Sequence, residues 1–380
     1  MASSTQNHQQ HFPTSSGTTS APPPTPSTTK HNFTSTSDSA ATDLLSRLLH
    51  RLPPTLSNTP LLLRRRSSLA STTTTSPPVV PFSELNSSFS TTLPSVSELG
   101  FFQLTSHSIP SELARSAESD SLSLFNLPRH LKHQHFPRSW PLGFDDDDDD
   151  EEDTGTGDSL FLDSSCSTDS SELSLSSLRE FTREMEKIGF AVVEALLCAM
   201  GLQNPAGDDP DSLCSMMWVS NRSGSPDDKL VGSGEFYPYV IGLHYQFRSQ
   251  SCSLLADPGW VTVSSSMDSI LVTLGDIAQV WSNGKLKKVR GKPALSMEEG
   301  NNSSPLTSMS LLVTLPLEST VSPLYPRVVI SNHDNKNQNE DEDCESNEVN
   351  TFNSFSFEDY AWRVYHERVP LKDPLDRYRI

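Results

Sequence analysis

Six short apolar-rich runs, separated by turn residues, constrain the fold of this chain more than any other feature. Runs of this length with turns between them predict short antiparallel β-strands. Ser282-Asn283-Gly284 stands between two of the runs, and Asn-Gly tolerates the positive φ angles of a type I′ turn, which predicts a tight hairpin there. The runs are 238–247, 259–263, 269–275, 277–281, 285–290 and 308–315.

A long amphipathic helix is predicted ahead of these runs. Between Leu173 and Met200 the apolar residues recur at helical spacing, and Gly201 is a typical helix end. Further upstream, Val79–Phe82 and Leu99–Leu104 predict short strands, and Thr105–Pro110 predicts a turn that opens a helix. Helices followed by many short antiparallel strands indicate an α+β unit that ends in a jelly roll, the double-stranded β-helix.

Composition divides the rest of the chain into folded and disordered parts. Only 34% of the 380 residues are hydrophobic, and Ser, Thr and Pro fill long stretches that bury too little apolar surface to offset the entropy of ordering. Within the leader, the apolar residues of Thr42–Leu52 recur at helical spacing, which predicts a short helix there. The predicted segments are a disordered leader at 1–76, an N-terminal module at 77–143, an acidic disordered insertion at 144–170, the long helix and jelly-roll core at 171–330, an acidic loop at 331–353, and a C-terminal helix and tail at 354–380.

The net charge of −20 is concentrated in two places. Asp145–Asp153 is an unbroken acidic run, and Asp334–Glu348 is rich in acids; together they carry fifteen of the twenty net charges. Such runs are typical of solvated loops. Neither has the spaced ligands and Gly of a calcium loop. Because no Lys/Arg stripe offsets the acidity, we expect no nucleic-acid partner.

Cysteine use and hydropathy bear on the compartment. The five cysteines are scattered without a CxxC pair, which is typical of a reduced intracellular protein. No stretch approaches the ~18 continuous apolar residues of a membrane span, so we expect no membrane partner. The hydroxyl-rich leader with Arg64-Arg65-Arg66 has the composition of a plastid transit peptide, although we favour a plain disordered leader. The expected location is cytoplasmic, with the plastid as the alternative.

Several motifs resemble one family. Gly100–Pro110 and Leu271–Asp276 are similar to segments of the plant 2-oxoglutarate/Fe(II)-dependent oxygenases, the isopenicillin N synthase-like group that includes flavonol synthase, gibberellin oxidases and aminocyclopropane-carboxylate oxidase. The segments Val80–Leu85, Leu124–Pro128, Gln279–Val289 and Phe355–Ile380 also match. The resemblance covers roughly residues 78 to 380 apart from the acidic insertions, and it implies the same jelly-roll fold.

The resemblance also implies a set of ligands. Family members hold iron with two His and one carboxylate, the first pair arriving as His-x-Asp just before a strand. The second His follows the Asn-Gly turn, and an Arg-x-Ser pair on a later strand holds the far carboxylate of 2-oxoglutarate. In this chain Gly291 stands at the second His position and Ser308-Met309-Ser310 at Arg-x-Ser, so Ser308 replaces the Arg.

The His-x-Asp position allows two registers. Counting back from Trp260 without a gap places Phe236-Tyr237-Pro238 there. With a gap, Phe236–Pro238 matches the Tyr-Pro run that precedes the ligands in the family, and Gly242–Gln246 becomes the ligand strand. We favour this second register, in which His244 is the first His and Gln246 replaces the carboxylate. None of the eleven His has Asp or Glu two places on, so no register rebuilds the triad.

Other candidate residues are more readily explained by structure. His130, His133 and His135 form the densest His cluster, but we expect a solvated loop there rather than a metal site. We interpret His107 as a turn residue, Asp276 as a turn or capping carboxylate, and His244 as a hydrogen-bonded barrel residue. Trp260 and Trp281 are predicted core aromatics.

The absent ligands decide the functional expectation. Gly and Ser offer neither imidazole nor guanidinium, and a neutral amide is a poor replacement for an anionic ligand. We therefore predict no catalytic, cofactor-binding or metal-binding residues and no bound Fe(II) or 2-oxoglutarate. The expected role is that of an inactive pseudoenzyme retained to bind a small molecule or a protein. The alternative is a divergent active dioxygenase of plant specialised or hormone metabolism with non-standard ligands.

Overall fold

The computed structural model describes residues 74–145, 159–167, 173–203, 205, 212–222, 236–295, 306–324, 351–367 and 372–380. These residues belong to one compact unit, Ser71–Ile380. The predicted helix at 42–52, most of the leader and most of both acidic runs lie outside the described residues. Within the described part, no helix is long and apolar enough to cross a membrane.

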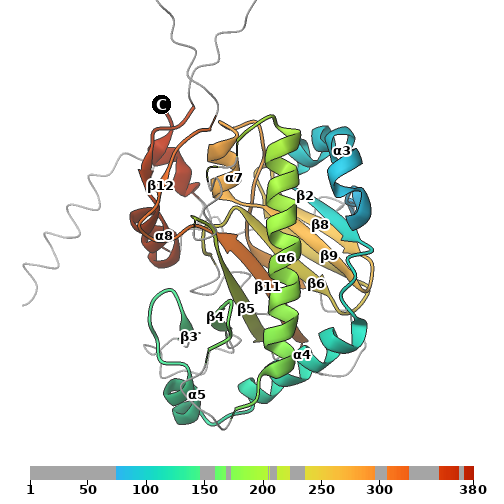
Figure 1. The fold of residues 1–380 in the computed structure, drawn as a ribbon. Helices are drawn as coiled ribbons and strands as arrows, with labels where there is room; N and C mark the ends of the chain where they lie inside the picture. Colours follow the sequence, from blue (N-terminus) through green and yellow to red (C-terminus); the bar gives the residue numbers. More distant parts are fainter. Residues whose placement is uncertain are drawn as a thin grey trace, which may run out of the picture. The chain divides into compact units, whose positions relative to one another are not determined.

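One large sheet and one small sheet form the two walls of the barrel (Figure 1). All neighbours in the large sheet are antiparallel except β1 and β2. In order across the large sheet, the strands are β1 (Val79–Pro81), β2 (Phe101–Thr105), β9 (Ser269–Leu274), β6 (Ile241–Gln246), β11 (Leu306–Thr314), β5 (Cys214–Arg222), β4 (Ser159–Asp163) and β3 (Gly143–Asp145). The small sheet contains β10 (Val289–Leu295), β7 (Gln250–Ala256) and β8 (Gly259–Ser265). A third pair joins β12 (Thr320–Val321) to β13 (Phe355–Ser356).

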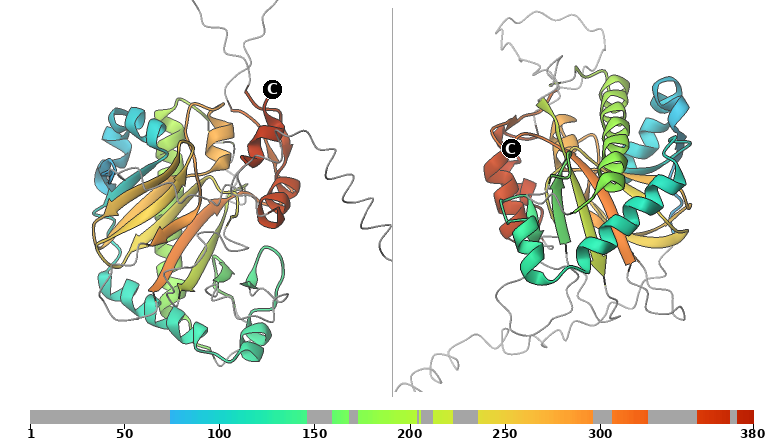
Figure 2. Two further views of the ribbon diagram at one scale, coloured as in Figure 1. Left: turned by 180° about the vertical axis from the view of Figure 1, so that it is seen from behind. Right: turned by 60° about the horizontal axis from the view of Figure 1, so that its bottom comes forward.

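The described helices flank these sheets. They are α3 (Leu85–Leu99), α4 (Ser111–Phe125), α5 (Arg129–His135), α6 (Ser176–Ala199), α7 (Asp276–Trp281) and α8 (Phe357–His366), with 3₁₀ turns η1 (Phe82–Glu84) and η3 (Pro374–Tyr378). Figure 2 shows α3, α4 and α6 on one side of the large sheet and α8 on the other. Strands β6 and β9 are buried along their whole length because helices cover one face and the small sheet the other.

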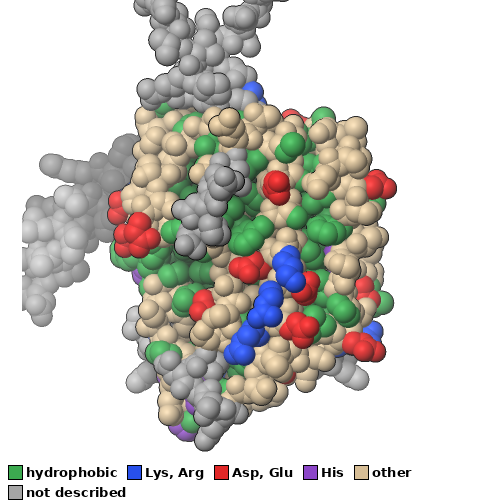
Figure 3. All heavy atoms as spheres, viewed as in Figure 1, with side chains coloured by type: hydrophobic (Ala, Val, Ile, Leu, Met, Phe, Trp, Pro, Cys, Tyr) green, Lys and Arg blue, Asp and Glu red, His purple; other side chains and the backbone are tan. Residues whose placement is uncertain are grey.

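The long helix α6 confirms the amphipathic pattern read from the sequence. Its inward residues include Phe181, Met185 and Val192, all fully buried. A Cβ at Gly189 would lie 2.8 Å from Cγ2 of Val313, so the glycine lets the helix approach β11 closely. The outer face carries Lys and Arg in a short row with acidic side chains beside them (Figure 3).

The barrel interior has its own small apolar cluster between the two sheets. Phe101 and Leu271 from the large sheet meet Cys252, Leu254 and Val289 from the small one. Burial raises the pKa of the Cys252 thiol to about 12, as expected for a thiol surrounded by apolar groups. The α+β jelly-roll prediction is confirmed.

Four local predictions are wrong. The run 277–281 is helix α7 rather than a strand, because all its side chains are buried and a helix can bury every face. Asn283 and Gly284 have the predicted positive φ angles of 53° and 86°, but they end this helix instead of joining two strands. His130–His135 is helical in α5 rather than a loop. Ser159–Asp163, inside the predicted disordered insertion, forms β4, because it pairs with β3 and β5 and buries its first four side chains.

Candidate functional site

The two registers of the first ligand lead to two different cavities. Phe236 and Tyr237 come just before strand β6 and line one cavity together with Gly291. His244 and Gln246 lie within β6 and border another cavity together with Ser308 and Ser310. Our preference for His244 as the first ligand stays a prediction. In neither register do the residues at the ligand positions offer two imidazoles and a carboxylate.

The strand that carries Gly291 is distorted at this point. Arg290 pairs with Leu255 and Ala294 with Ser253, so Gly291–Pro293 face the single residue Leu254 in a β-bulge. Gly291 has φ 69°, a left-handed conformation that side chains larger than glycine's rarely adopt. The position of the second His therefore differs from an ordinary strand in backbone as well as in side chain.

His244 is held inside the barrel by two hydroxyl groups. Its Nδ1 lies 2.7 Å from Oγ of Ser310, and its Nε2 lies 3.0 Å from Oγ1 of Thr273. Burial lowers the pKa of His244 to about 3, so the ring is neutral near pH 7. Both ring nitrogens are thus engaged, and the prediction of a hydrogen-bonded barrel histidine is confirmed.

Tyr239 continues the series of hydrogen-bonded side chains Ser310, His244 and Thr273 toward the β-bulge; we call this series the polar chain. Its hydroxyl lies 3.2 Å from Oγ1 of Thr273 and donates to the carbonyl oxygen of Val289 at 2.8 Å. The same hydroxyl lies 3.3 Å from the carbonyl oxygen of Gly291. Burial raises the pKa of Tyr239, which keeps the phenol neutral. Tyr239 and His244 thereby fill the space between the bulge and Ser310.

The position of the missing Arg is closed in the same way. The hydroxyl of Ser308 lies 2.7 Å from that of Ser220 on the neighbouring strand. The cavity bordered by His244, Gln246, Ser308 and Ser310 measures only about 20 Å³, room for about one water molecule. His244, Gln246, Ser308 and Ser310 do not fit Fe(II) held by two imidazoles and a carboxylate, nor the far carboxylate of 2-oxoglutarate. The guanidinium of Arg248 also borders this cavity, but it is paired with Glu118 at 3.2 Å. Among the described residues, no three His, Cys, Asp or Glu gather as metal ligands.

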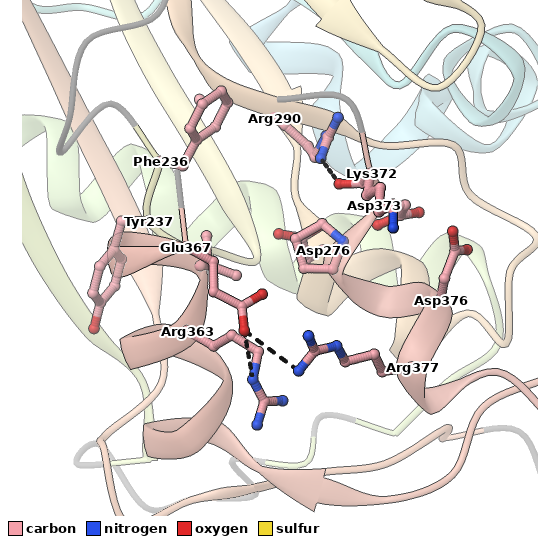
Figure 4. A pocket seen from close by; sticks show the side chains of 13 residues that line it. Phe236, Tyr237, Asp276, Arg290, Arg363, Glu367, Lys372, Asp373, Asp376 and Arg377 are labelled. Carbon is pink, nitrogen blue, oxygen red and sulfur yellow. Dashed lines mark hydrogen bonds and ion pairs between the residues drawn. The ribbon is translucent and has the colours of Figure 1, made fainter. Parts of the chain in front are cut away.

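The open space lies at the mouth of the barrel. A cavity of about 560 Å³ is bounded on one side by Phe236, Tyr237, Asp276, Arg290 and Gly291. The other side is formed by residues of α8 and η3 in the C-terminal segment (Figure 4). We call this space the mouth cavity. Its volume is within the range of small-molecule sites.

A buried lysine ties the C-terminal segment to the barrel beside this cavity. Lys288 is 1% exposed, and its Nζ lies 2.9 Å from Oδ1 of Asp276 and 2.5 Å from Oδ1 of Asp373. Burial is the largest single effect on the Asp373 carboxyl and would raise its pKa, but the charge and hydrogen bond of Lys288, together with the Leu375 N–H and the charge of Arg290, hold that pKa below its ordinary value. Asp276, predicted as a turn or capping carboxylate, is therefore one of the two acids that pair with the buried Lys288.

A second ion-pair group lies on the C-terminal side of the mouth cavity. Oε1 of Glu367 is 3.4 Å from Nε of Arg363 and 3.3 Å from Nη1 of Arg377. Across the cavity, Nη1 of Arg290 donates to the carbonyl oxygen of Lys372 at 3.0 Å, and its guanidinium carbon lies 6.0 Å from the centre of the Phe236 ring. Sequence reasoning missed these arginines because nothing in their local pattern distinguishes them from surface residues.

The remaining candidates are placed as follows. His107 is buried and its Nε2 lies 3.0 Å from the carbonyl oxygen of Asp268, so it is a structural turn residue as predicted. The ring of His133 packs edge-on against Phe144, 6.5 Å between centroids. Trp281 is buried as predicted. Trp260 is 44% exposed, so its prediction as a core aromatic is wrong; it lies on β8, which exposes alternate side chains.

Comparisons with known proteins agree with this fold. No family model matches the chain. Gibberellin 2-beta-dioxygenase 1 of Arabidopsis thaliana is 22% identical over 72% of this chain and 83% of its own length. 1-Aminocyclopropane-1-carboxylate oxidase 3 of Cucumis melo is 26% identical over 54% of this chain and 67% of its own. 

Two solved structures share the architecture. One is JOX2 in complex with 2OG, Fe and JA, with a TM-score of 0.60 and 17% identity over 81% of this chain and 90% of that one. The other is the rice dioxygenase for auxin oxidation, with a TM-score of 0.57 and 16% identity over 80% of this chain and 99% of that one.

Proposed function

We propose that this chain, which belongs to the 2-oxoglutarate/Fe(II)-dependent oxygenase superfamily, is a non-catalytic binding protein that has kept the scaffold and lost the iron chemistry. The observation that carries the proposal is the filled barrel interior. The polar groups of four interior side chains hydrogen-bond to one another: those of Tyr239, Thr273, His244 and Ser310. Iron and its cosubstrate would need unoccupied ligand atoms in this space. Fold alone does not imply the activity of relatives.

The donor chemistry supports the same conclusion. The ligand positions hold Phe236, Pro238 and Gly291 in one register and His244, Gln246 and Gly291 in the other, so they provide at most one imidazole and no carboxylate. Ser308 provides no charge-assisted anchor to a carboxylate. To become a ligand, His244 would have to give up the hydrogen bond at one of its two ring nitrogens. One nitrogen donor is too few for the facial triad that non-haem iron oxygenases use.

The test is turnover of 2-oxoglutarate. Purified protein is incubated with added Fe(II), ascorbate, oxygen and 2-oxoglutarate, and succinate release is measured beside gibberellin 2-beta-dioxygenase 1 of Arabidopsis thaliana as the positive control. We expect succinate at the protein-free background. Repeated turnovers, above one succinate per chain, would refute the proposal.

The second candidate is a divergent active dioxygenase. Relatives that match in sequence carry names of dioxygenases and oxidases, which favours it. It requires donors other than those at the three ligand positions. Succinate release that survives a His244→Gln substitution would favour this candidate with unidentified ligands, whereas release that is lost would make His244 one of its ligands.

A further inference from the structure

Strand β8 lies at the edge of the small sheet, where its backbone is accessible to a further strand. Among the described strands it pairs with β7 alone. An edge strand presents a row of N–H and C=O groups with which another extended segment can pair. One face of β8 is inward, since Val261 and Val263 pack against the interior cluster, whereas Trp260 is 44% exposed on the other face.

The first described residues of the chain already contact this edge. The backbone N–H of Thr75 donates to the carbonyl oxygen of Thr262 at 2.8 Å, and Thr75 forms a parallel bridge with Val263. A parallel bridge fixes both the direction and the register of any pairing that continues from it. Continued upstream, this register matches residue 73 with Val261 and residue 71 with Gly259, where β8 begins.

The backbone of β8 offers the partners that this register requires. The N–H and C=O of one residue point to the same side of a strand, and those of the next residue point to the opposite side. Because the C=O of Thr262 faces Thr75, the N–H of Thr262 and the C=O of Trp260 face the same edge. In the continued register, the N–H of Thr73 donates to the C=O of Trp260, and the N–H of Thr262 donates to the C=O of Thr73.

The sequence at the end of the leader is suited to a short strand. Residues 71–76 read Ser-Thr-Thr-Thr-Thr-Ser, and the β-branched side chain of Thr favours strands. Pro77 and Pro78 follow and have no N–H with which to continue a ladder. The compact unit begins at Ser71, the residue that the register matches with the first residue of β8.

We propose that the outer edge of β8 is a docking surface for the chain's own leader, whose residues 71–75 pair with it in parallel as a fourth strand of the small sheet. Thr73 and Thr75 share the inward face of Val261 and Val263, and Thr72 lies on the outer face beside Trp260. The added strand covers an edge with which a strand of a second copy could otherwise pair. The proposal is independent of the loss of iron chemistry.

Hydrogen–deuterium exchange of the full chain, resolved to single amides by fragmentation in the mass spectrometer, tests this pairing at the amide of Thr262. Thr73→Pro removes the N–H directed at Trp260 and places the proline ring against β8. We expect the Thr262 amide to exchange at least about tenfold faster than in the unsubstituted protein, because its acceptor is no longer held in place. Thr72→Pro is the matched control, since the N–H of residue 72 points away from β8 and proline is tolerated there; we expect no change in the exchange rate of Thr262.

Four results would overturn the proposal. Exchange of the Thr262 amide at one rate in all three proteins would show that the leader does not cover this edge. Equal acceleration by both prolines would contradict the register. An equal acceleration at Val263, whose N–H points to β7, would contradict a docked strand, because β7 and β8 should stay paired without it. Protection of Thr262 that increases with protein concentration would mean that a second copy of the chain covers the edge.

Discussion

The interior of the barrel and its mouth differ in free volume and in charge. The interior is filled: His244 and Tyr239 occupy it as neutral groups, and the cavity left beside His244 measures about 20 Å³. The mouth is hollow and charged, with about 560 Å³ enclosed by ion pairs. In relatives that hold iron and 2-oxoglutarate, the interior must stay open. In this chain, hydrogen-bonded side chains fill the interior, and the mouth cavity lies outside it, between the barrel and the C-terminal segment.

The largest expected effect concerns the mouth. Lys288→Met removes the cation between Asp276 and Asp373, which leaves the buried carboxylate of Asp276 without its ion-pair partner and Asp373 with only its 3.4 Å contact to Arg379. We expect a loss of about 3–5 kcal/mol in the free energy of unfolding, as measured by urea denaturation.

Lys187→Met is the matched control for this change. Lys187 pairs with Glu184 at 2.6 Å, but its side chain is 63% exposed. An exposed pair of this kind contributes about 0.2–1 kcal/mol. If the two lysine variants lost equal stability, Lys288 would not be the buried tie between barrel and C-terminal segment.

The next effect concerns the interior. His244→Ala deletes a buried ring and leaves the hydroxyls of Ser310 and Thr273 without their partner. The cavity and the lost hydrogen bonds should together cost about 2–4 kcal/mol in urea denaturation. A loss below about 0.5 kcal/mol would mean that the interior is not tightly filled, and the comparison between interior and mouth would fail.

A smaller effect is expected at the other end of the polar chain. Tyr239→Phe keeps the ring and removes only the hydroxyl, which leaves the carbonyl oxygen of Val289 with one acceptor contact fewer. We expect a loss of about 1–2 kcal/mol by the same measurement. An unchanged or higher stability would show that this hydroxyl does not join the bulge to the interior.

The smallest effect is a dependence on pH. The pKa of His244 is lowered to about 3 in the folded state, from about 6.5 when unfolded, so the unfolded chain binds more protons between these values. Stability from this residue is therefore complete above about pH 6.5 and decreases as the pH falls. Between pH 7.5 and 5.5 its share is about 1 kcal/mol.

The His244→Gln variant isolates that share. Gln keeps polar atoms in the interior but does not titrate, so the slope of unfolding free energy against pH should become shallower in this range. His107 also has a lowered pKa, because burial outweighs the hydrogen bond to Asp268, and it contributes with the same sign in both proteins. An unchanged slope in the variant would mean that His244 takes up protons in the folded protein as it does in the unfolded chain.

Sequence reasoning reached the fold because its signals are local. The helical spacing of α6, the short apolar-rich runs separated by turns, and the family-like segments at Gly100–Pro110 and Leu271–Asp276 all act over a few residues. It failed at 277–281, because an apolar run of five residues fits a buried helix as well as a strand.

The candidate site was only partly predictable. The loss of the second His and of the Arg could be counted from the Asn-Gly turn, which fixes the register on that side. The register of the first ligand could not, because Phe236–Pro238 and Gly242–Gln246 both match segments of the family, and their places before and within β6 depend on pairing with distant strands. The mouth cavity depends on contacts between residues far apart in sequence, such as Lys288 with Asp373, and no local pattern marks them.

Iron binding tests the central claim most directly. The protein is reconstituted anaerobically with one equivalent of Fe(II) and excess 2-oxoglutarate, passed through a desalting column, and its iron content is measured by mass spectrometry. Our account predicts iron well below a tenth of an equivalent per chain. One tightly held iron per chain would contradict it, because a barrel interior filled by Tyr239 and His244 would then have to open and supply ligands.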